Sequence, residues 1–308
     1  MKPDIEIPHR VQRLDDRGDL PLIALLAPGG RALVCLQGAH VIDYQPSGQP
    51  PLLWLSDQTP FKVGLPIRGG IPLCWPWFGD HPQDATLPAH GLARARRWQL
   101  VDSAADASST RLRLRLEQDS TTRQLWPYAF RLELLIQLDQ QLSLTLTCHN
   151  PNDRPMPISE ALHSYFRVAD IAPVEVGGLL GCRYRDKLEQ MAVKVQQTPL
   201  TLDGETDRVY LDTRATITLD DPGLRRQIRI AKSGSDSTVV WNPWRERSAR
   251  MPDMSTDGYR TMLCVESANA ADNALEIGAG QSHSLSIQLS SHAYAPDPAM
   301  DTGATGQP

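Results

Sequence analysis

Residues 159–168 place a histidine, a tyrosine and an arginine at alternating positions. If this segment is a β-strand, His163, Tyr165 and Arg167 share one face, because successive side chains of a strand point to opposite sides. An imidazole in such a row can give or take a proton near neutral pH, so the row is suited to one wall of a binding cleft. A solvent-exposed strand face has the same pattern, and by itself the segment favours that simpler interpretation.

Glu266 is the most anomalous polar residue, because it ends an apolar run that begins at residue 261. Alternation puts it on one strand face with Met262 and Cys264. A carboxylate among apolar neighbours loses hydration, which raises its pKa and suits it to act as a general base. A glutamate at the wet end of a strand explains the same residues, and the segment alone does not separate the two interpretations.

The loop at residues 68–79, RGGIPLCWPWFG, concentrates aromatic, proline and glycine residues. Aromatic faces suit the apolar faces of a sugar ring, and Arg68 supplies a planar cationic fork. A core plug beneath a long loop has the same composition and stays open as an explanation. Further along, His90 and Arg94 stand four residues apart around a glycine, which is a weak signal by itself.

Several enzyme classes lack their sequence signatures. The chain contains no Gly-x-Ser-x-Gly elbow, phosphate-binding P-loop, Gly-x-Gly-x-x-Gly or His-Glu-x-x-His motif. The eight histidines show no metal-ligand spacing, so we expect neither a metal nor a cofactor. The five cysteines are widely spaced, which favours reduced, mostly buried thiols over a disulfide framework.

The composition is that of an ordinary globular chain. It has 308 residues, of which 41% are hydrophobic and 22% charged, with a net charge of −5. We therefore expect no nucleic-acid partner. The first residues contain no apolar segment, and the uncharged residues 277–296 are too polar to span a membrane. The sequence predicts a cytoplasmic protein without membrane attachment.

Period-two alternation predicts the elements that would position these residues. It is strongest at residues 111–116, 130–138 and 142–148, with a hairpin turn at 139–141. Further strands are predicted at residues 31–36, 215–219, 227–231, 238–241, 261–265 and 284–289. Since no convincing helical period interrupts them, we predict a large all-β antiparallel sandwich. We expect one domain at 1–295 and a mobile tail at 296–308.

Six segments together resemble the hexose-6-phosphate mutarotases (glucose-6-phosphate 1-epimerases) of the aldose 1-epimerase superfamily. They are IRGGIPLCWPWFG at 67–79, LPAHGLAR at 87–94, ALHSYF at 161–166, TDRVY at 206–210, VVWNPW at 239–244 and CVESAN at 264–269. The resemblance covers most of the chain. It implies a β-supersandwich of the galactose mutarotase type and cofactor-free interconversion of sugar anomers.

The resemblance also implies roles for individual residues. His163 would be the general acid and Glu266 the general base. Arg68, Arg94 and Asp207 match positions that contact the substrate, and His90 matches a second cleft histidine. Position 89 is alanine, where some members place a substrate-contacting glutamine, so one binding contact is in doubt.

The expected partner is a small sugar phosphate such as glucose 6-phosphate, bound by a monomer. Two guanidinium groups can clamp a phosphate dianion, and Arg68 and Arg94 are the candidates. Possible helpers are Arg96, Arg97 and Lys232. Trp241 and Trp244 could stack on the sugar, although burial in the core explains them at least as well.

Other functions compete with this one. An epimerase of unphosphorylated aldoses would use the same acid and base. A non-catalytic sugar-phosphate-binding protein would need neither. A glycosidase is the weakest alternative, since nothing in the sequence fixes two carboxylates about 5–9 Å apart.

Overall fold

Nearly all regular structure in the described residues is β-strand. The computed structural model describes residues 5–294, so the tail expected at 296–308 lies outside the described residues. Two short α-helices are present in this part, α1 at Ser120–Leu125 and α2 at Trp244–Ser248. Single 3-10 turns lie at Ala93–Ala95, Lys187–Glu189, Gly258–Thr261 and Ala271–Asn273. No helix in residues 5–294 is long and apolar enough to cross a membrane.

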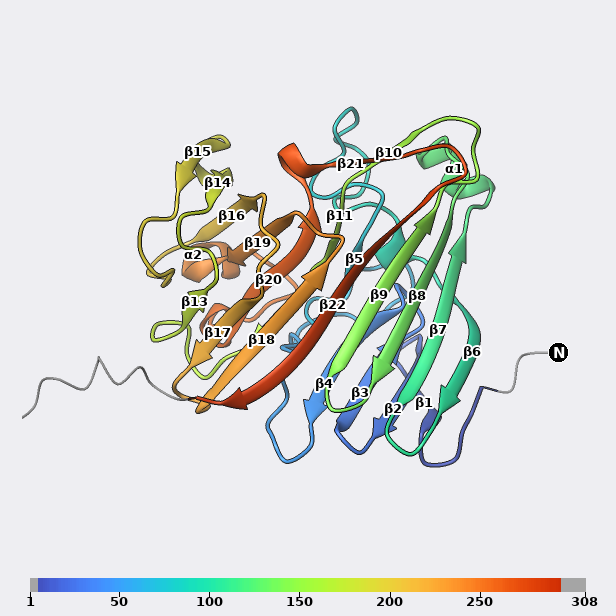
Figure 1. The fold of residues 1–308 in the computed structure, drawn as a ribbon, viewed down its shortest axis with the longest axis horizontal. Coiled ribbons are helices and arrows are strands. Elements are labelled where there is room, and N and C mark those ends of the chain that lie inside the picture. Colours follow the sequence, from blue (N-terminus) through green and yellow to red (C-terminus); the bar gives the residue numbers. More distant parts are fainter. Residues whose placement is uncertain (1–4, 295–308) are drawn as a thin grey trace, which may run out of the picture.

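Two large sheets and one smaller sheet form the body of the molecule (Figure 1). Sheet I has the order β13 (Glu175–Gly177), β17 (Ile217–Asp221), β18 (Arg226–Ser233), β22 (Ser282–Ala293), β9 (Leu142–His149), β8 (Arg131–Leu138), β7 (Thr110–Glu117) and β6 (Gln99–Ala105). Sheet II has the order β15 (Ala192–Val195), β14 (Arg183–Asp186), β16 (Thr206–Leu211), β19 (Ser237–Asn242), β20 (Met262–Asn269), β11 (Glu160–Leu162) and β5 (Leu73–Cys74), and β12 (Tyr165–Arg167) also pairs with β20.

The remaining strands form two smaller units. Sheet III contains β1 (Val11–Arg17), β2 (Leu20–Ala27), β3 (Gly30–Cys35) and β4 (His40–Pro46), and lies against the β7–β8 part of sheet I. Strands β10 (Met156–Ile158) and β21 (Leu275–Ile277) pair with each other. All these strand pairs are antiparallel, which confirms the predicted all-β antiparallel sandwich.

Alternating burial explains how sheet I packs. In β7, Leu112 and Leu114 are fully buried, while Arg111 and Arg113 are exposed. Burying one leucine contributes about 1.5–3 kcal/mol, and the pattern repeats along β8 and β9. The turn between those two strands is closed by the backbone N–H of Gln141, which donates to the Asp139 carboxylate at 3.0 Å. The core formed by these leucines continues into sheets II and III.

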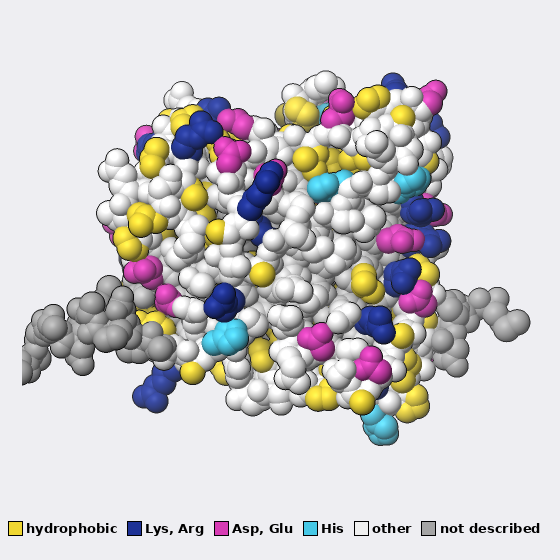
Figure 2. Space-filling model, viewed as in Figure 1, with side chains coloured by type: hydrophobic (Ala, Val, Ile, Leu, Met, Phe, Trp, Pro, Cys, Tyr) yellow, Lys and Arg dark blue, Asp and Glu magenta, His cyan; other side chains and the backbone are white. Residues whose placement is uncertain are grey.

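The outer face of sheet I is covered mainly by uncharged polar side chains, with charges nearer its edges (Figure 2). Serine and threonine alternate with buried leucines on β9 and β22, so this face meets solvent. It offers no concentration of charge for an anionic partner. The residues that could act in binding or catalysis lie instead on sheet II.

Candidate active site on sheet II

A cavity of about 310 Å³ opens on the outer face of sheet II. Its lining contains Arg68, Phe78, Ala89, His90, Arg94, His163, Lys187, Asp207, Val239, Trp241, Arg247, Met251 and Glu266. All seven site residues predicted from the sequence are among them. We call this cavity the cleft.

The register of sheet II explains why residues far apart in sequence meet here. One row across neighbouring strands holds Asp207, Trp241, Cys264 and Tyr165. The next row holds Val209, Val239 and Glu266. Residues two apart on a strand share a face, so Asp207, Trp241 and Glu266 all point outward into the cleft. The sequence of β16 does not show which residues point to which face, because both faces are buried and the alternation of polar and apolar residues is lost.

His163 and Glu266 form a buried pair at the base of the cleft. The imidazole Nε2 lies 3.4 Å from Glu266 Oε1, and the side chains are only 8% and 1% exposed. Glu266 is therefore not a strand-end residue in water. The second atoms of the pair, His163 Nδ1 and Glu266 Oε2, are buried without a hydrogen-bond partner in the protein. Such unsatisfied atoms are costly unless a ligand or water bonds to them.

Burial also changes the proton affinities of this pair. It raises the pKa of Glu266 well above its usual value, and it lowers the pKa of His163 well below the usual value. Nearby His90 and Arg68 lower the pKa of His163 further. Both shifts favour the uncharged forms, a carboxylic acid and a neutral imidazole.

Tyr165 and Arg68 support the imidazole. The Tyr165 ring stacks on His163 with centroids 4.8 Å apart and planes 6° from parallel. Arg68 donates to the Tyr165 hydroxyl at 3.0 Å and pairs with Asp253 at 2.9 Å. Of the row His163, Tyr165 and Arg167, only His163 lines the cleft, and Tyr165 is buried beneath it, so the row is neither a continuous cleft wall nor an exposed face. The strand is interrupted between β11 and β12.

His90 reaches the cleft from a tight loop. Its backbone N–H donates to the Gly79 carbonyl at 2.6 Å, and Gly79 N–H donates back to the His90 imidazole at 3.3 Å. His90 adopts a φ of 64°, which is uncommon for a residue with a side chain and marks a locally strained backbone. Burial, reinforced by Arg94, lowers the pKa of His90 to about 3. The ring is therefore neutral at working pH and suited to hydrogen bonding.

The aromatic loop at residues 68–79 is partly a core plug and partly a wall of the cleft, the two interpretations that the sequence left open. Trp75 and Trp77 are buried in the main core, as the plug interpretation required. Phe78 lines the cleft, as the sugar-face interpretation required. Trp241 is 7% exposed and lines the cleft, whereas Trp244 packs on Tyr259 outside it. A sugar-stacking role for Trp244 is therefore wrong.

The expected helper cations are also elsewhere. Arg96 bonds Thr121, Arg97 is exposed, and neither lines the cleft. Lys232 lies on β18 in sheet I and lines a different cavity. The expectation that these three residues help to bind phosphate is wrong, because the sequence does not determine which sheet and which face a charged side chain occupies.

Two cleft cations were missed by the sequence reasoning. Lys187 lies in the 3-10 turn after β14 and pairs with Asp207 at 3.1 Å. Arg247 lies in α2 and pairs with Glu205 at 2.9 Å. Neither the turn nor the short helix has a periodic signal, so only its position three residues after the block at 239–244 could have drawn attention to Arg247.

Lys232 gives a prediction about stability rather than function. Its amine donates to the Ser237 carbonyl at 2.7 Å and to hydroxyl groups, and burial lowers its pKa to about 7 although Asp236 opposes this. Between that value and the ordinary 10.5, the unfolded chain binds more protons than the folded protein. The folded state should therefore gain stability as the pH rises through this window.

We expect the free energy of unfolding of the wild type, relative to Lys232→Met, to increase from pH 7 toward pH 9. The increase should be at most about 1.4 kcal/mol per pH unit. Urea denaturation at a series of pH values measures it. A difference between the two proteins that stays flat or decreases with pH contradicts the assignment.

Among residues 5–294, one group of potential metal ligands, His163, Cys264 and Glu266, lies at the base of the cleft with ligand atoms within 4.8 Å of one another, although Cys264 does not itself line the cleft. Metal ions bind thiolate and carboxylate rather than their protonated forms. Burial raises the pKa of both Cys264 and Glu266 well above their usual values. The protons held by these two groups oppose a resident metal ion.

Comparison with known proteins gives consistent matches. The family model described as "Aldose 1-epimerase" matches residues 21–290. A "Putative glucose-6-phosphate 1-epimerase" from Escherichia coli K12 is 39% identical over 255 residues, which cover 82% of this chain and 85% of that protein. One of the same name from Haemophilus influenzae is 30% identical and covers 92% of this chain and 94% of its own. The crystal structure of "a putative mutarotase" from Salmonella typhimurium matches with a TM-score of 0.86 at 35% identity, covering 94% of this chain and 96% of its own.

Proposed function

This chain belongs to the aldose 1-epimerase family, and from that membership we propose that it interconverts the α and β anomers of glucose 6-phosphate. The observation that carries the proposal is a buried acid–base pair, His163 and Glu266, at the base of a cleft lined by four cations. The names of the relatives in Escherichia coli and Haemophilus influenzae support the same substrate.

The pair suits a reaction that moves one proton in each direction. The substrate brings a phosphate dianion into the cleft, and its negative charge favours an imidazolium. On substrate binding, the proton held by Glu266 passes to His163 across the 3.4 Å contact. The resulting carboxylate is the general base and the imidazolium the general acid. No proton is exchanged with solvent in this step.

Ring opening and closure then use the two groups in turn. Glu266 takes the proton of the anomeric hydroxyl while His163 protonates the ring oxygen, and the C1–O5 bond breaks to give an aldehyde. After rotation about the C1–C2 bond, the C5 hydroxyl attacks the other face of the carbonyl. His163 recovers its proton and Glu266 returns the one it took. Each positioned group of this kind contributes typically about 10²–10⁴-fold.

The charges of the cleft support an anionic substrate. Arg68, Arg94, Lys187 and Arg247 line it together with one carboxylate, Asp207, besides the protonated Glu266. Three of these cations are paired with carboxylates, Asp253, Asp207 and Glu205, while Arg94 donates to the Ala89 carbonyl at 2.6 Å. Their guanidinium and ammonium donors still favour an anion at this site. Arg68 is tied to Tyr165 and hence to His163, so its loss should impair either sugar. Lys187 contacts neither Tyr165 nor His163, but it pairs with Asp207 and its charge opposes the raised pKa of Glu266, so it tests phosphate selectivity through the ratio of the two sugars.

We expect Lys187→Met to lower kcat/KM for glucose 6-phosphate about 10- to 100-fold, because a charge-assisted hydrogen bond to the phosphate is lost. For free glucose the loss should be smaller, because only the ion pair with Asp207 and the charge near Glu266 are then lost. Coupled polarimetry on both sugars measures the ratio. The matched control is Lys194→Met, on the same hairpin, whose amine pairs with Asp186 outside the cleft. Equal losses on both sugars would remove Lys187 from the phosphate site.

A further inference from the structure

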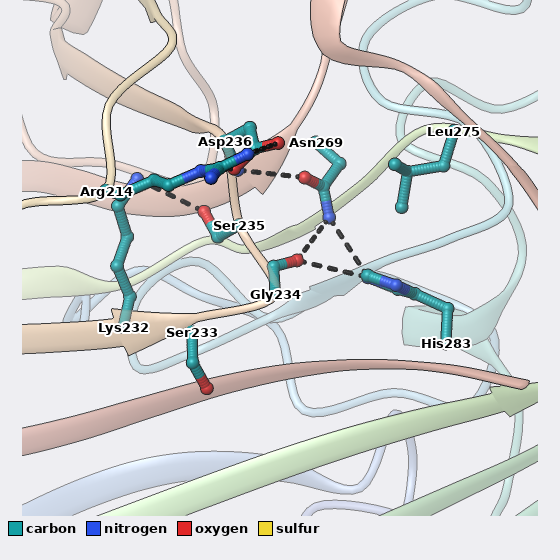
Figure 3. Close-up of a pocket in the computed structure, with 9 residues that line it drawn as sticks. All are labelled: Arg214, Lys232, Ser233, Gly234, Ser235, Asp236, Asn269, Leu275 and His283. Atoms are coloured by element: carbon teal, nitrogen blue, oxygen red, sulfur yellow. Dashed lines mark hydrogen bonds and ion pairs between the residues drawn. The ribbon is translucent and has the colours of Figure 1, made fainter.

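A second group of buried polar side chains lies on the opposite face of sheet II, beside a cavity of about 400 Å³ (Figure 3). Glu160 and Asn269 are 0% and 1% exposed. The Asn269 side-chain amide donates to Glu160 Oε1 at 3.0 Å and to the Gly234 carbonyl at 2.7 Å. His283 Nε2 lies 3.0 Å from the same Glu160 oxygen and 3.1 Å from the Gly234 carbonyl. The cluster therefore joins β11 and β20 of sheet II to β22 of sheet I.

The pairing of β11 and β12 with β20 follows one unbroken register. Glu160 lies opposite Asn269, and Tyr165, five residues later, lies opposite Cys264. Continuing this register through the gap between β11 and β12 places His163 directly opposite Glu266. Their 3.4 Å contact agrees with that position. The His163–Glu266 pair and the Glu160–Asn269 pair are thus two opposed residue pairs of the same strand pairing, three residues apart and on opposite faces of the sheet.

The regular part of this strand pairing is short, and the backbone bonds that extend it include His163 N–H to the Pro72 carbonyl at 3.0 Å and Tyr165 N–H to the Gly70 carbonyl at 2.9 Å. Strand β11 is three residues long, and its other neighbour, β5, is two residues long. A slip of one residue would turn His163 away from Glu266, because side chains alternate between faces. A hydrogen bond between the buried side chains of one opposed pair counteracts such a slip. The bond to Glu160 also raises the pKa of His283, which favours a charged partner for the carboxylate.

We propose that Glu160, Asn269 and His283 form a positioning lock that holds β11 in the register on which the His163–Glu266 contact depends. The lock rests on the proposed function, since it serves the acid–base pair. None of the three residues lines the cleft, so they act through strand placement rather than on substrate. Its loss changes the distance between acid and base, and misplacements of about 1 Å cost about 10²-fold in rate.

The test compares two buried asparagines. Asn269→Ala should lower kcat for glucose 6-phosphate about 10²-fold per folded molecule, with KM changed less than about threefold, because the phosphate-facing cations lie on other elements. Asn150→Ala is the matched control. The Asn150 side chain is fully buried and donates to the carbonyls of Arg154, Ile277 and Gly278, but it is not part of the lock. It should lose stability with an unchanged kcat. Glu160→Gln, which keeps the acceptor oxygen, should stay within about threefold of the wild-type kcat.

Amide hydrogen exchange at residues 161–163 provides a readout independent of activity. Faster exchange there in Asn269→Ala, but not in Asn150→Ala, supports the lock even if the wild type proves inactive and the proposed function fails. Wild-type kcat in folded Asn269→Ala, an equal loss in Asn150→Ala, or a loss in Glu160→Gln as large as in Asn269→Ala would overturn it.

Discussion

Replacing Glu266 with glutamine is expected to lower kcat for anomer exchange of glucose 6-phosphate by about 10³–10⁴-fold. The amide keeps the shape of the side chain but cannot take the proton of the anomeric hydroxyl. KM should change little, because Arg94, Lys187 and Arg247 remain in the cleft. Polarimetry from pure α anomer measures the rate after subtraction of the spontaneous reaction. Near-normal turnover in this variant would remove Glu266 from the mechanism.

The same variant should fold at least as well as the wild type. Because the folded-state pKa of Glu266 is raised, the stability linked to its proton is present below the ordinary pKa and is lost as the pH rises toward the folded value. Glutamine is neutral at every pH and does not suffer this loss. Thermal unfolding near pH 8 should therefore give a Tm for Glu266→Gln equal to or above that of the wild type. A large drop in Tm would assign the activity loss to misfolding.

Replacing His163 with asparagine is the second change with a large expected effect. Without the imidazole, Glu266 has no partner to pass its proton to and the proposed general acid is lost, so kcat should fall about 10²–10⁴-fold. Initial rates over a range of glucose 6-phosphate concentrations separate kcat from KM. A change confined to KM would make His163 a binding residue.

The pH profile of the wild type is a control for the role of His163. Burial lowers the pKa of this imidazole and raises that of Glu266, so a single proton is shared over a broad pH range. We expect kcat to be nearly flat around neutral pH, whereas an isolated histidine acid would lose activity above about pH 6.5.

Strands with one buried face were readable from the sequence, because leucine alternates with polar residues there. The segments at 111–116, 130–138 and 142–148 are β7, β8 and β9, and the turn at 139–141 is confirmed. Strands such as β2 and β16 escaped, since burial on both faces removes the alternation. The motif blocks located the seven predicted cleft residues because those residues have distinctive types at fixed spacing.

The site features that the sequence did not predict depend on tertiary geometry. Lys187 enters the cleft from a 3-10 turn, and no local pattern distinguishes it from Lys194 seven residues later. Lys232 was expected to help bind phosphate, yet it belongs to sheet I and faces a different cavity. The split of the aromatic loop, with Trp75 in the core and Phe78 in the cleft, likewise follows from packing alone.

Saturation-transfer NMR on equilibrated glucose 6-phosphate, with free glucose in a parallel sample, tests the central claim most directly. We expect the folded protein to transfer magnetisation between the phosphorylated anomers, and far more weakly between the anomers of glucose. Transfer with glucose alone would instead indicate an epimerase of unphosphorylated aldoses. No transfer with either sugar from folded protein would contradict the proposed catalysis and favour a sugar-phosphate-binding protein.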